Sequence, residues 1–179
     1  MIVKYNDISE DIFFRPVEEA DVEKWVGWRN SEEVKKYYIY RGEFTVKSQL
    51  DWIRANVDTG KACLMLICLS GSERPIGSVH IKDIDPFHKK GEYGLFIGEE
   101  DAKGHGYGTA TARMMLRYGF EELGLHRIYL KTIEGNERAI KSYEHAGFER
   151  EGVLRDEVFL DGEYRNIILM AAINPKEKG

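Results

Sequence analysis

The hydrophobic positions of the chain change period several times, and each change marks a boundary between expected elements. Residues 62–69 form one continuous apolar run, which predicts a strand buried on both faces. Residues 107–123 repeat apolar side chains at helical spacing over a wide arc, which predicts a helix packed on a sheet. Further strands are expected at residues 11–17, 76–84, 90–98, 127–133, 149–159 and 164–173, and further helices at 22–29, 46–57 and 137–146.

The order of these elements, β-α-α-β-β-β-α-β-α-β-β, predicts a mixed α/β (α+β) fold. Short turns join the strands at 62–69, 76–84 and 90–98, so they should form an antiparallel meander. A helix separates strand 90–98 from strand 127–133, and such a crossover makes a parallel pair. We therefore expect one domain over residues 1–174 with a mostly antiparallel central sheet, and a disordered tail at 175–179.

A glycine-rich loop lies between strand 90–98 and the following helix. Gly104, Gly106 and Gly108 stand at alternate positions. Glycine permits positive φ and close approach of a bulky anion, and the first turn of a helix offers unpartnered N–H groups. The loop therefore predicts a pyrophosphate site that needs no basic side chain, with a purely structural turn as the alternative. A dinucleotide site is disfavoured, because it requires a parallel strand directly before the loop.

Composition sets limits on compartment and partners. The hydrophobic fraction of 42% and charged fraction of 32% are typical of soluble globular proteins. No apolar run approaches the ~20 residues that span a bilayer, and the N-terminus lacks the features of a secretory signal. The net charge of −5 disfavours nucleic acid and is compatible with a cationic amine. Cys63 and Cys68 should point to opposite faces of a strand, so we expect reduced cysteines, no metal site and a cytoplasmic location.

Two motifs make the chain resemble N-acetyltransferases of the GNAT superfamily over about residues 11–173. The first is the acetyl-CoA loop, here residues 103–108, in which Lys103 stands where the family usually has arginine or glutamine. The second, Asn-x-x-Ala-x-x-x-Tyr-x-x-x-Gly-Phe, is matched without gaps by Asn136, Ala139, Tyr143, Gly147 and Phe148. Residues 28–30, 125–128 and 151–155 further resemble the branch that holds ribosomal-protein N-terminal and spermidine acetyltransferases.

The resemblance implies direct transfer of an acetyl group from acetyl-CoA to a primary amine in a ternary complex. It also implies that the two parallel strands splay apart around the pantetheine arm. A backbone N–H near residues 95–97 would then act as an oxyanion donor. Gly94 and Gly98 indicate a bulge there, or are needed only for packing. The expected cofactor-binding residues are Leu95, Phe96, Ile97, Lys103, Gly104, His105, Gly106, Tyr107, Gly108, Thr109, Asn136, Ala139, Ser142 and Tyr143.

Tyr143 matches the family tyrosine near the CoA sulfur, so it is the expected general acid, with a core tyrosine as the alternative. Asn136 should hydrogen-bond the pantetheine amide, cap its helix, or do both. A primary amine is mostly an ammonium at pH 7, so a carboxylate should take its proton, and Glu92 is the first candidate. The other candidates for this base are Glu134, Asp156, Glu157, His80 and His126, and bulk solvent can also serve.

The acceptor is expected to meet residues 28–44, with a solvated helical connection as the alternative. The candidate substrate-binding residues there are Arg29, Asn30, Tyr37 and Tyr38. Acceptors compatible with the resemblance are a protein N-terminal alanine or serine, a polyamine such as spermidine, and an amino sugar. Dimers are common in this branch, so a homodimer is compatible with it. A CoA-binding regulatory module without catalysis is the alternative of another class, and Tyr143 and the unbroken glycine loop disfavour it.

Overall fold

The structure, a computed structural model, describes residues 2–177. Its strands are β1 (Ile12–Pro16), β2 (Cys63–Leu69), β3 (Pro75–Asp85), β4 (Lys90–Ile97), β5 (Arg127–Ile133), β6 (Glu149–Leu160) and β7 (Glu163–Ile173). Its helices are α1 (Val22–Asn30), α2 (Glu32–Lys35), α3 (Val46–Trp52), α4 (Tyr107–Glu121) and α5 (Glu137–Ala146). The expected mixed α/β order is confirmed, with α2 as an addition. This short helix is capped by the Ser31 side chain, which accepts a hydrogen bond from the N–H of Val34.

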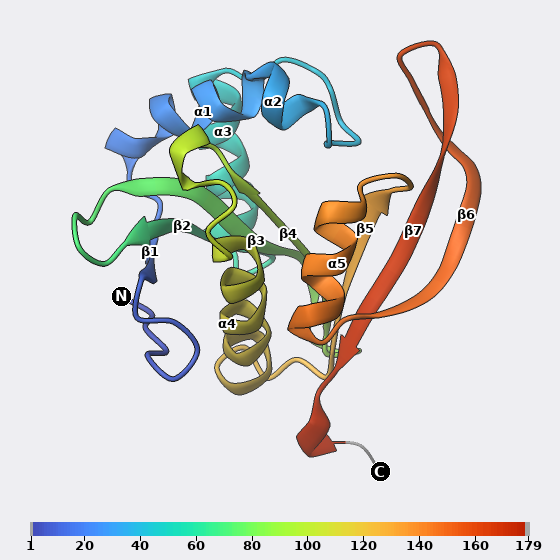
Figure 1. The fold of residues 1–179 in the computed structure, drawn as a ribbon. Helices are drawn as coiled ribbons and strands as arrows, with labels where there is room; N and C mark the ends of the chain where they lie inside the picture. Colours follow the sequence, from blue (N-terminus) through green and yellow to red (C-terminus); the bar gives the residue numbers. More distant parts are fainter. Residues whose placement is uncertain (1, 178–179) are drawn as a thin grey trace.

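The seven strands form one sheet in the order β1-β2-β3-β4-β5-β7-β6. All neighbours are antiparallel except β4 and β5, whose parallel pairing runs only from Lys90↔Arg127 to Glu92↔Tyr129. Beyond Glu92 the two strands separate, and Figure 1 shows them diverging between two halves of the sheet. The parallel pair is therefore confirmed, and its splay opens the middle of the sheet.

Helices cover both faces of the sheet. One apolar layer joins α4 and α5 to the sheet and includes Met114, Met115 and Ile140, while the other joins α1 and includes Trp25 (Figure 1). Strand β2 is buried between the two layers, as its continuous apolar run predicts. Cys63 packs on the α4 side and Cys68 on the α1 side, so the expected opposite orientation is confirmed, and both thiols are free.

The helix expected at residues 46–57 begins at Val46, as expected. Thr45 and Ser48 form a capping box at its start. Val46 lies in the first turn and is 40% exposed, so it adds little to the buried face of the helix. The helix continues through a wider π-type turn at Ile53–Val57. Each helix within residues 2–177 falls short of the length and apolar character needed to cross a membrane.

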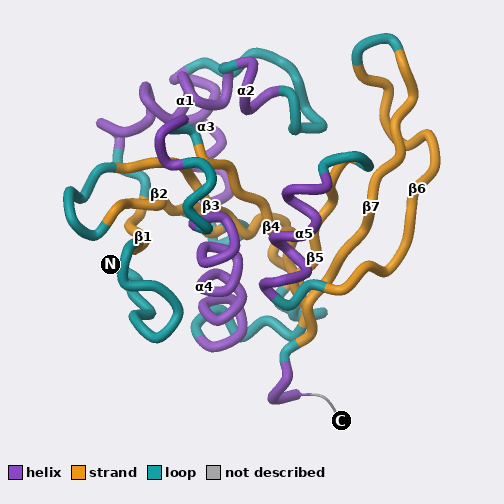
Figure 2. The backbone as a smooth tube through the Cα atoms, viewed as in Figure 1, coloured by secondary structure: helices purple, strands orange, loops and turns teal. Residues whose placement is uncertain are grey.

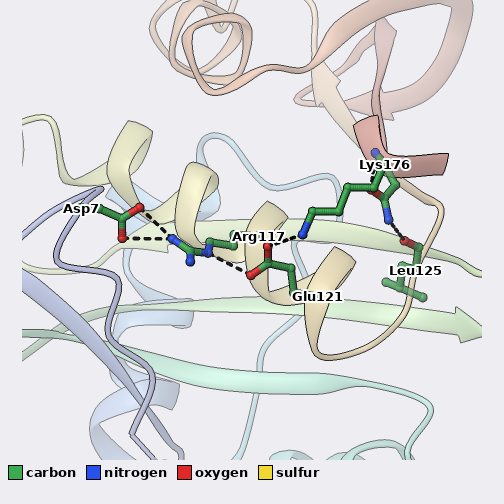
Figure 3. Close-up of polar contacts among 6 residues, drawn as sticks. Asp7, Arg117, Glu121, Leu125 and Lys176 are labelled. Atoms are coloured by element: carbon green, nitrogen blue, oxygen red, sulfur yellow. Dashed lines mark hydrogen bonds and ion pairs between the residues drawn. The ribbon is translucent and has the colours of Figure 1, made fainter. Parts of the chain in front are cut away.

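Ion pairs on α4 connect the two ends of the chain (Figure 3). Arg117 Nη1 lies 2.8 Å from a carboxylate oxygen of Asp7, and Arg117 Nε lies 2.9 Å from Glu121. Glu121 also pairs with Lys176 Nζ at 3.0 Å. Within the tail expected to be disordered, the structure has a helical turn at Pro175–Glu177, and residues 178–179 lie outside the described part. Such exposed pairs contribute little to stability, because solvent screens them.

Strands β6 and β7 form a long hairpin that extends beyond the helices (Figure 2). Its turn contains Asp161 and Gly162, both with positive φ (53° and 84°), which is the geometry that twisted two-residue hairpin turns require. Arg41 Nη1 reaches Asp161 Oδ2 at 2.5 Å. The segment between α2 and α3 is thereby joined to the tip of the hairpin.

Candidate functional site

A cavity of about 1080 Å³ lies where β4 and β5 separate. It is walled by both strands, by the glycine loop and α5, and by α1 with the segment that follows α2. The expected site residues that line it are Arg29, Tyr37, Tyr38, Glu92, Leu95, Phe96, Ile97, Lys103, Gly104, Gly106, Tyr107, Gly108, Thr109, Asn136, Ala139, Ser142 and Tyr143. Residues that lie up to 114 positions apart (143 − 29) therefore share one cavity.

The glycine loop has the backbone that its composition predicts at two of its three positions. Gly104 (φ 87°) and Gly106 (φ 80°) are left-handed, and a side chain at either would enter open space. Gly106 is the N-cap of α4, which runs for 15 residues. Gly108 already lies inside that helix, so its φ requires no glycine. An open cradle at the positive end of a long helix fits a pyrophosphate.

The side chains around this loop contact one another. Lys103 is ion-paired with Glu100 and, at 3.6 Å, with Glu33. Thr109 Oγ1 and Ser142 Oγ lie 2.9 Å apart and join α4 to α5. The His105 side chain is not part of the cavity lining, and its ring stacks on that of Tyr107 with centroids 5.6 Å apart.

The glycines flanking residues 95–97 serve packing, so the expected bulge is wrong. The pairing of β3 with β4 runs without interruption from Gly77↔Ile97 to Lys82↔Glu92. A Cβ on Gly94 would come within 2.6 Å of His80 Nε2. A Cβ on Gly98 would come within 2.4 Å of the Trp28 ring. Only glycine leaves room for these two side chains beside the strand.

Tyr143 lies in an aromatic cluster at the cavity wall. Its ring contacts those of Tyr93 and Phe148, with centroids 6.0 and 5.9 Å away. Burial, followed by the nearby Tyr38, raises the pKa of Tyr143 well above its usual value of about 10. Its hydroxyl therefore keeps its proton at neutral and mildly alkaline pH, as a proton donor must.

Tyr93 is a cavity residue that sequence reasoning missed. It is 3% exposed, and within residues 2–177 its buried Oη has no hydrogen-bond partner. A buried hydroxyl without a partner costs about 1–3 kcal/mol. A tyrosine in an apolar strand has the sequence pattern of an ordinary core residue, so no local signal distinguishes it.

Asn136 occupies the N-cap position of α5, but its side chain makes no capping hydrogen bond. Its backbone (φ −82°, ψ 59°) lies outside the extended region that N-cap residues usually adopt. The capping interpretation is therefore wrong. The side-chain amide lines the cavity without a capping bond, which suits an amide-bonding role toward a ligand.

Of the carboxylates considered as the general base, Glu92 lines the cavity. Its side chain is 17% exposed and pairs with Lys82 Nζ at 3.2 Å. The expected alternatives Glu134, Asp156, Glu157 and His126 lie outside the lining. Glu134 accepts a hydrogen bond from Asn166 Nδ2 at 2.9 Å, and Asp156 lies in an irregular part of β6.

His80 lines the cavity but is a poor base. Burial, then the charges of Lys82 and Arg29, lowers its pKa to about 3. Imidazole with so low a pKa takes a proton from an ammonium group very unfavourably, since useful bases have pKa values near the working pH.

The same lowered pKa predicts an acid-sensitive stability. The unfolded chain protonates His80 near pH 6.5, whereas the folded protein does so only near pH 3, so the free energy of unfolding falls as pH decreases through that window. Between pH 7 and pH 5, wild type should lose about 1–2 kcal/mol more than His80→Gln, measured by urea denaturation. His88→Gln, at an exposed position, is the control. Equal losses in wild type and His80→Gln would contradict the assignment.

The acceptor side of the cavity combines aromatic rings with one guanidinium group. Burial raises the pKa of Tyr38 to about 12, and its ring contacts Phe96 at 6.0 Å. The Asn30 side chain does not line the cavity: its Nδ2 donates to the carbonyl of Phe44, and its Oδ1 accepts from the Phe44 N–H. Tyr37 lines the cavity, although it is 49% exposed.

The splayed strands, the anion cradle at a helix N-terminus and the tyrosine beside them define an acyltransferase that uses a CoA thioester. The chain belongs to the acetyltransferase (GNAT) domain family, whose model matches residues 11–149. It is an N-acetyltransferase with acetyl-CoA as the acetyl donor. Among residues 2–177, no group of three or more His, Cys, Asp or Glu side chains is arranged to hold a metal ion.

Comparisons with known proteins agree with this family. The chain is 28% identical over 162 residues to spermidine N(1)-acetyltransferase of Escherichia coli (strain K12), which covers 90% of the chain and 86% of that protein. It is 30% identical over 103 residues to YdaF of Bacillus subtilis, whose name provisionally assigns it to the ribosomal N-acetyltransferases, covering 58% and 56%. The fold matches spermidine N-acetyltransferase from Vibrio cholerae in complex with CoA and spermine, with a TM-score of 0.86, 22% identity, and coverage of 92% and 96%.

Proposed function

We propose that this N-acetyltransferase acetylates the primary amine of a small molecule or of a protein N-terminus by direct attack in a ternary complex. The observation that carries the proposal is the single cavity that runs from the start of α4, between β4 and β5, to Tyr143 and Arg29. Such a cavity accommodates donor and acceptor together, which direct transfer requires.

The donor half of the cavity is suited to CoA. The backbone N–H groups of residues 103–109 would bind the pyrophosphate, since the cradle at Gly104 and Gly106 is open. The free side-chain amide of Asn136 would bond the pantetheine arm. Acetyl-CoA, when bound, supplies an acetyl group activated as a thioester.

Where β4 has separated from β5, its backbone N–H groups are available to polarise the thioester carbonyl. The pairing of the two strands ends at Glu92, so β5 makes no ladder hydrogen bonds to residues 95–97. A backbone N–H of this segment would donate to the carbonyl oxygen as negative charge develops on it.

Two side chains would handle the protons. Tyr143 would donate its hydroxyl proton to the leaving thiolate, which its raised pKa permits. Glu92 would accept the proton that the ammonium of the acceptor releases, and the Lys82 ammonium 3.2 Å away would hold its carboxylate in place.

The proposal is tested by thiol release from acetyl-CoA with a panel of amines and N-terminal peptides. We expect release that depends on the acceptor, with one acetylated amine formed per thiol. Binding of acetyl-CoA without release for every amine would favour a regulatory CoA-binding module instead. A protein that does not bind acetyl-CoA would overturn the placement of the donor.

A further inference from the structure

Arg29 is a half-buried guanidinium group at the cavity wall, and no carboxylate of residues 2–177 contacts it. It donates a hydrogen bond to Gln49 Oε1 and lies over two aromatic rings, Phe44 at 3.7 Å and Trp25 at 5.1 Å. Within residues 2–177 none of the ion pairs includes it, and desolvation lowers its pKa. A cation that is shielded from water is normally paired with an anion, so the Arg29 guanidinium is suited to bind an anionic group of a ligand.

The carboxylates around the same cavity already have partners. Glu92 and Asp83 both pair with Lys82, at 3.2 and 3.8 Å. Glu33 and Glu100 both pair with Lys103. A polycationic acceptor would have to displace these lysines, and it would also meet the positive charge of Arg29. The half of the cavity around Arg29 therefore disfavours a second positive charge on the acceptor.

Arg29, Tyr38 and Tyr143 line the same cavity. The positive charge of Arg29 opposes the rise that burial causes in the pKa of Tyr38, and Tyr38 adds to the rise in the pKa of Tyr143. The Tyr38 ring also contacts Phe96 of β4 at 6.0 Å. A small acceptor could therefore contact Arg29 while its amine approaches the thioester near Tyr143.

We propose that the acceptor carries an anionic group, a carboxylate or a phosphate, in addition to its amine, and that Arg29 binds this group. The inference rests on the proposed function. When an acceptor fills the cavity, water leaves the guanidinium group. An anionic oxygen of the acceptor compensates for the lost water by accepting short, charge-assisted hydrogen bonds. The planar guanidinium suits both carboxylate and phosphate, in two parallel bonds.

Matched acceptors that differ in one anionic group test the proposal. One pair is 4-aminobutyrate with its neutral amide, and the other is glucosamine 6-phosphate with glucosamine, while spermidine represents the polycations. We expect kcat/KM to favour the anionic member of at least one pair by about ten- to a hundredfold, the range for one charge-assisted contact. The pair that shows the larger preference distinguishes carboxylate from phosphate.

Arg29 variants locate the source of this preference. Arg29→Gln should reduce it to about twofold or less, mainly through KM of the anionic acceptor, and Arg29→Lys should retain part of it. KM for acetyl-CoA and kcat/KM for the neutral acceptors should stay close to wild type, which a merely structural role would not predict. Arg54→Gln removes an exposed guanidinium outside the cavity and serves as the control.

Each outcome decides between the two proposals. Preference for spermidine or for the neutral members, unchanged in Arg29→Gln, would overturn the anionic acceptor and leave the proposed function intact. An equal loss of all acceptors together with a lower Tm would also overturn it, because Arg29 would then act structurally. Absence of transfer to every amine would overturn the proposed function, and this inference with it.

Discussion

Replacing Tyr143 with phenylalanine is expected to lower kcat by about 10²- to 10⁴-fold while the affinity for acetyl-CoA changes little. The substitution keeps the ring that packs on Tyr93 and Phe148 and removes only the hydroxyl. The lost group is the proposed donor to the thiolate, so the cost should appear in the chemical step. Single-turnover rates and a direct binding titration with acetyl-CoA separate the two effects.

Tyr118→Phe is the matched control for this prediction. It also removes the hydroxyl of a buried tyrosine, but Tyr118 belongs to α4 and does not line the cavity. Its kcat should stay within about threefold of wild type, as for a change outside the site. A Tyr143→Phe variant with the turnover of Tyr118→Phe would remove Tyr143 as the acid.

The raised pKa of Tyr143 adds an expected pH dependence. Because burial disfavours the phenolate, the acid form persists as pH rises past 10, the usual pKa of tyrosine. Wild-type kcat should therefore show no loss on the alkaline side from ionisation of this residue up to about pH 10. A decline in kcat between pH 8 and 9 that vanishes in Tyr143→Phe would contradict this.

Local patterns in the sequence predicted most of the fold, since period and caps are properties of neighbouring residues. Strand β5 has the expected bounds, Arg127–Ile133, and Gly147 ends α5 with positive φ as a C-terminal glycine should. The glycine loop was predicted for the same reason: positive φ at Gly104 and Gly106 is a local requirement.

Features that depend on distant residues were not predictable in this way. Gly98 is a glycine because the ring of Trp28, 70 positions earlier (98 − 28), occupies the place of its side chain. Arg29 lacks a carboxylate partner among residues 2–177 because of what surrounds it in three dimensions, which its own sequence neighbours do not reveal. The capping role expected of Asn136 is not observed for a related reason: its residue type suits a cap, but its backbone conformation does not.

Replacing Gly106 with valine is expected to weaken acetyl-CoA binding by about ten- to a hundredfold, the equivalent of losing one or more charge-assisted hydrogen bonds. The added side chain would enter the open space in front of the loop, where the pyrophosphate is proposed to lie. A β-branched residue also resists the φ of 80° that starts α4. Equilibrium titration with CoA measures the effect without requiring an acceptor.

Backbone strain alone must be separated from obstruction of the ligand, and Gly124→Val provides that comparison. Gly124 also has positive φ (64°) and open space around its Cβ position, but it lies beyond the other end of α4 and outside the cavity. Both variants should lose about 1–2 kcal/mol of stability from the left-handed conformation. Only Gly106→Val should lose CoA affinity, because only there does the side chain stand between the ligand and the helix N-terminus. Similar affinities in the two variants would mean that the pyrophosphate binds elsewhere.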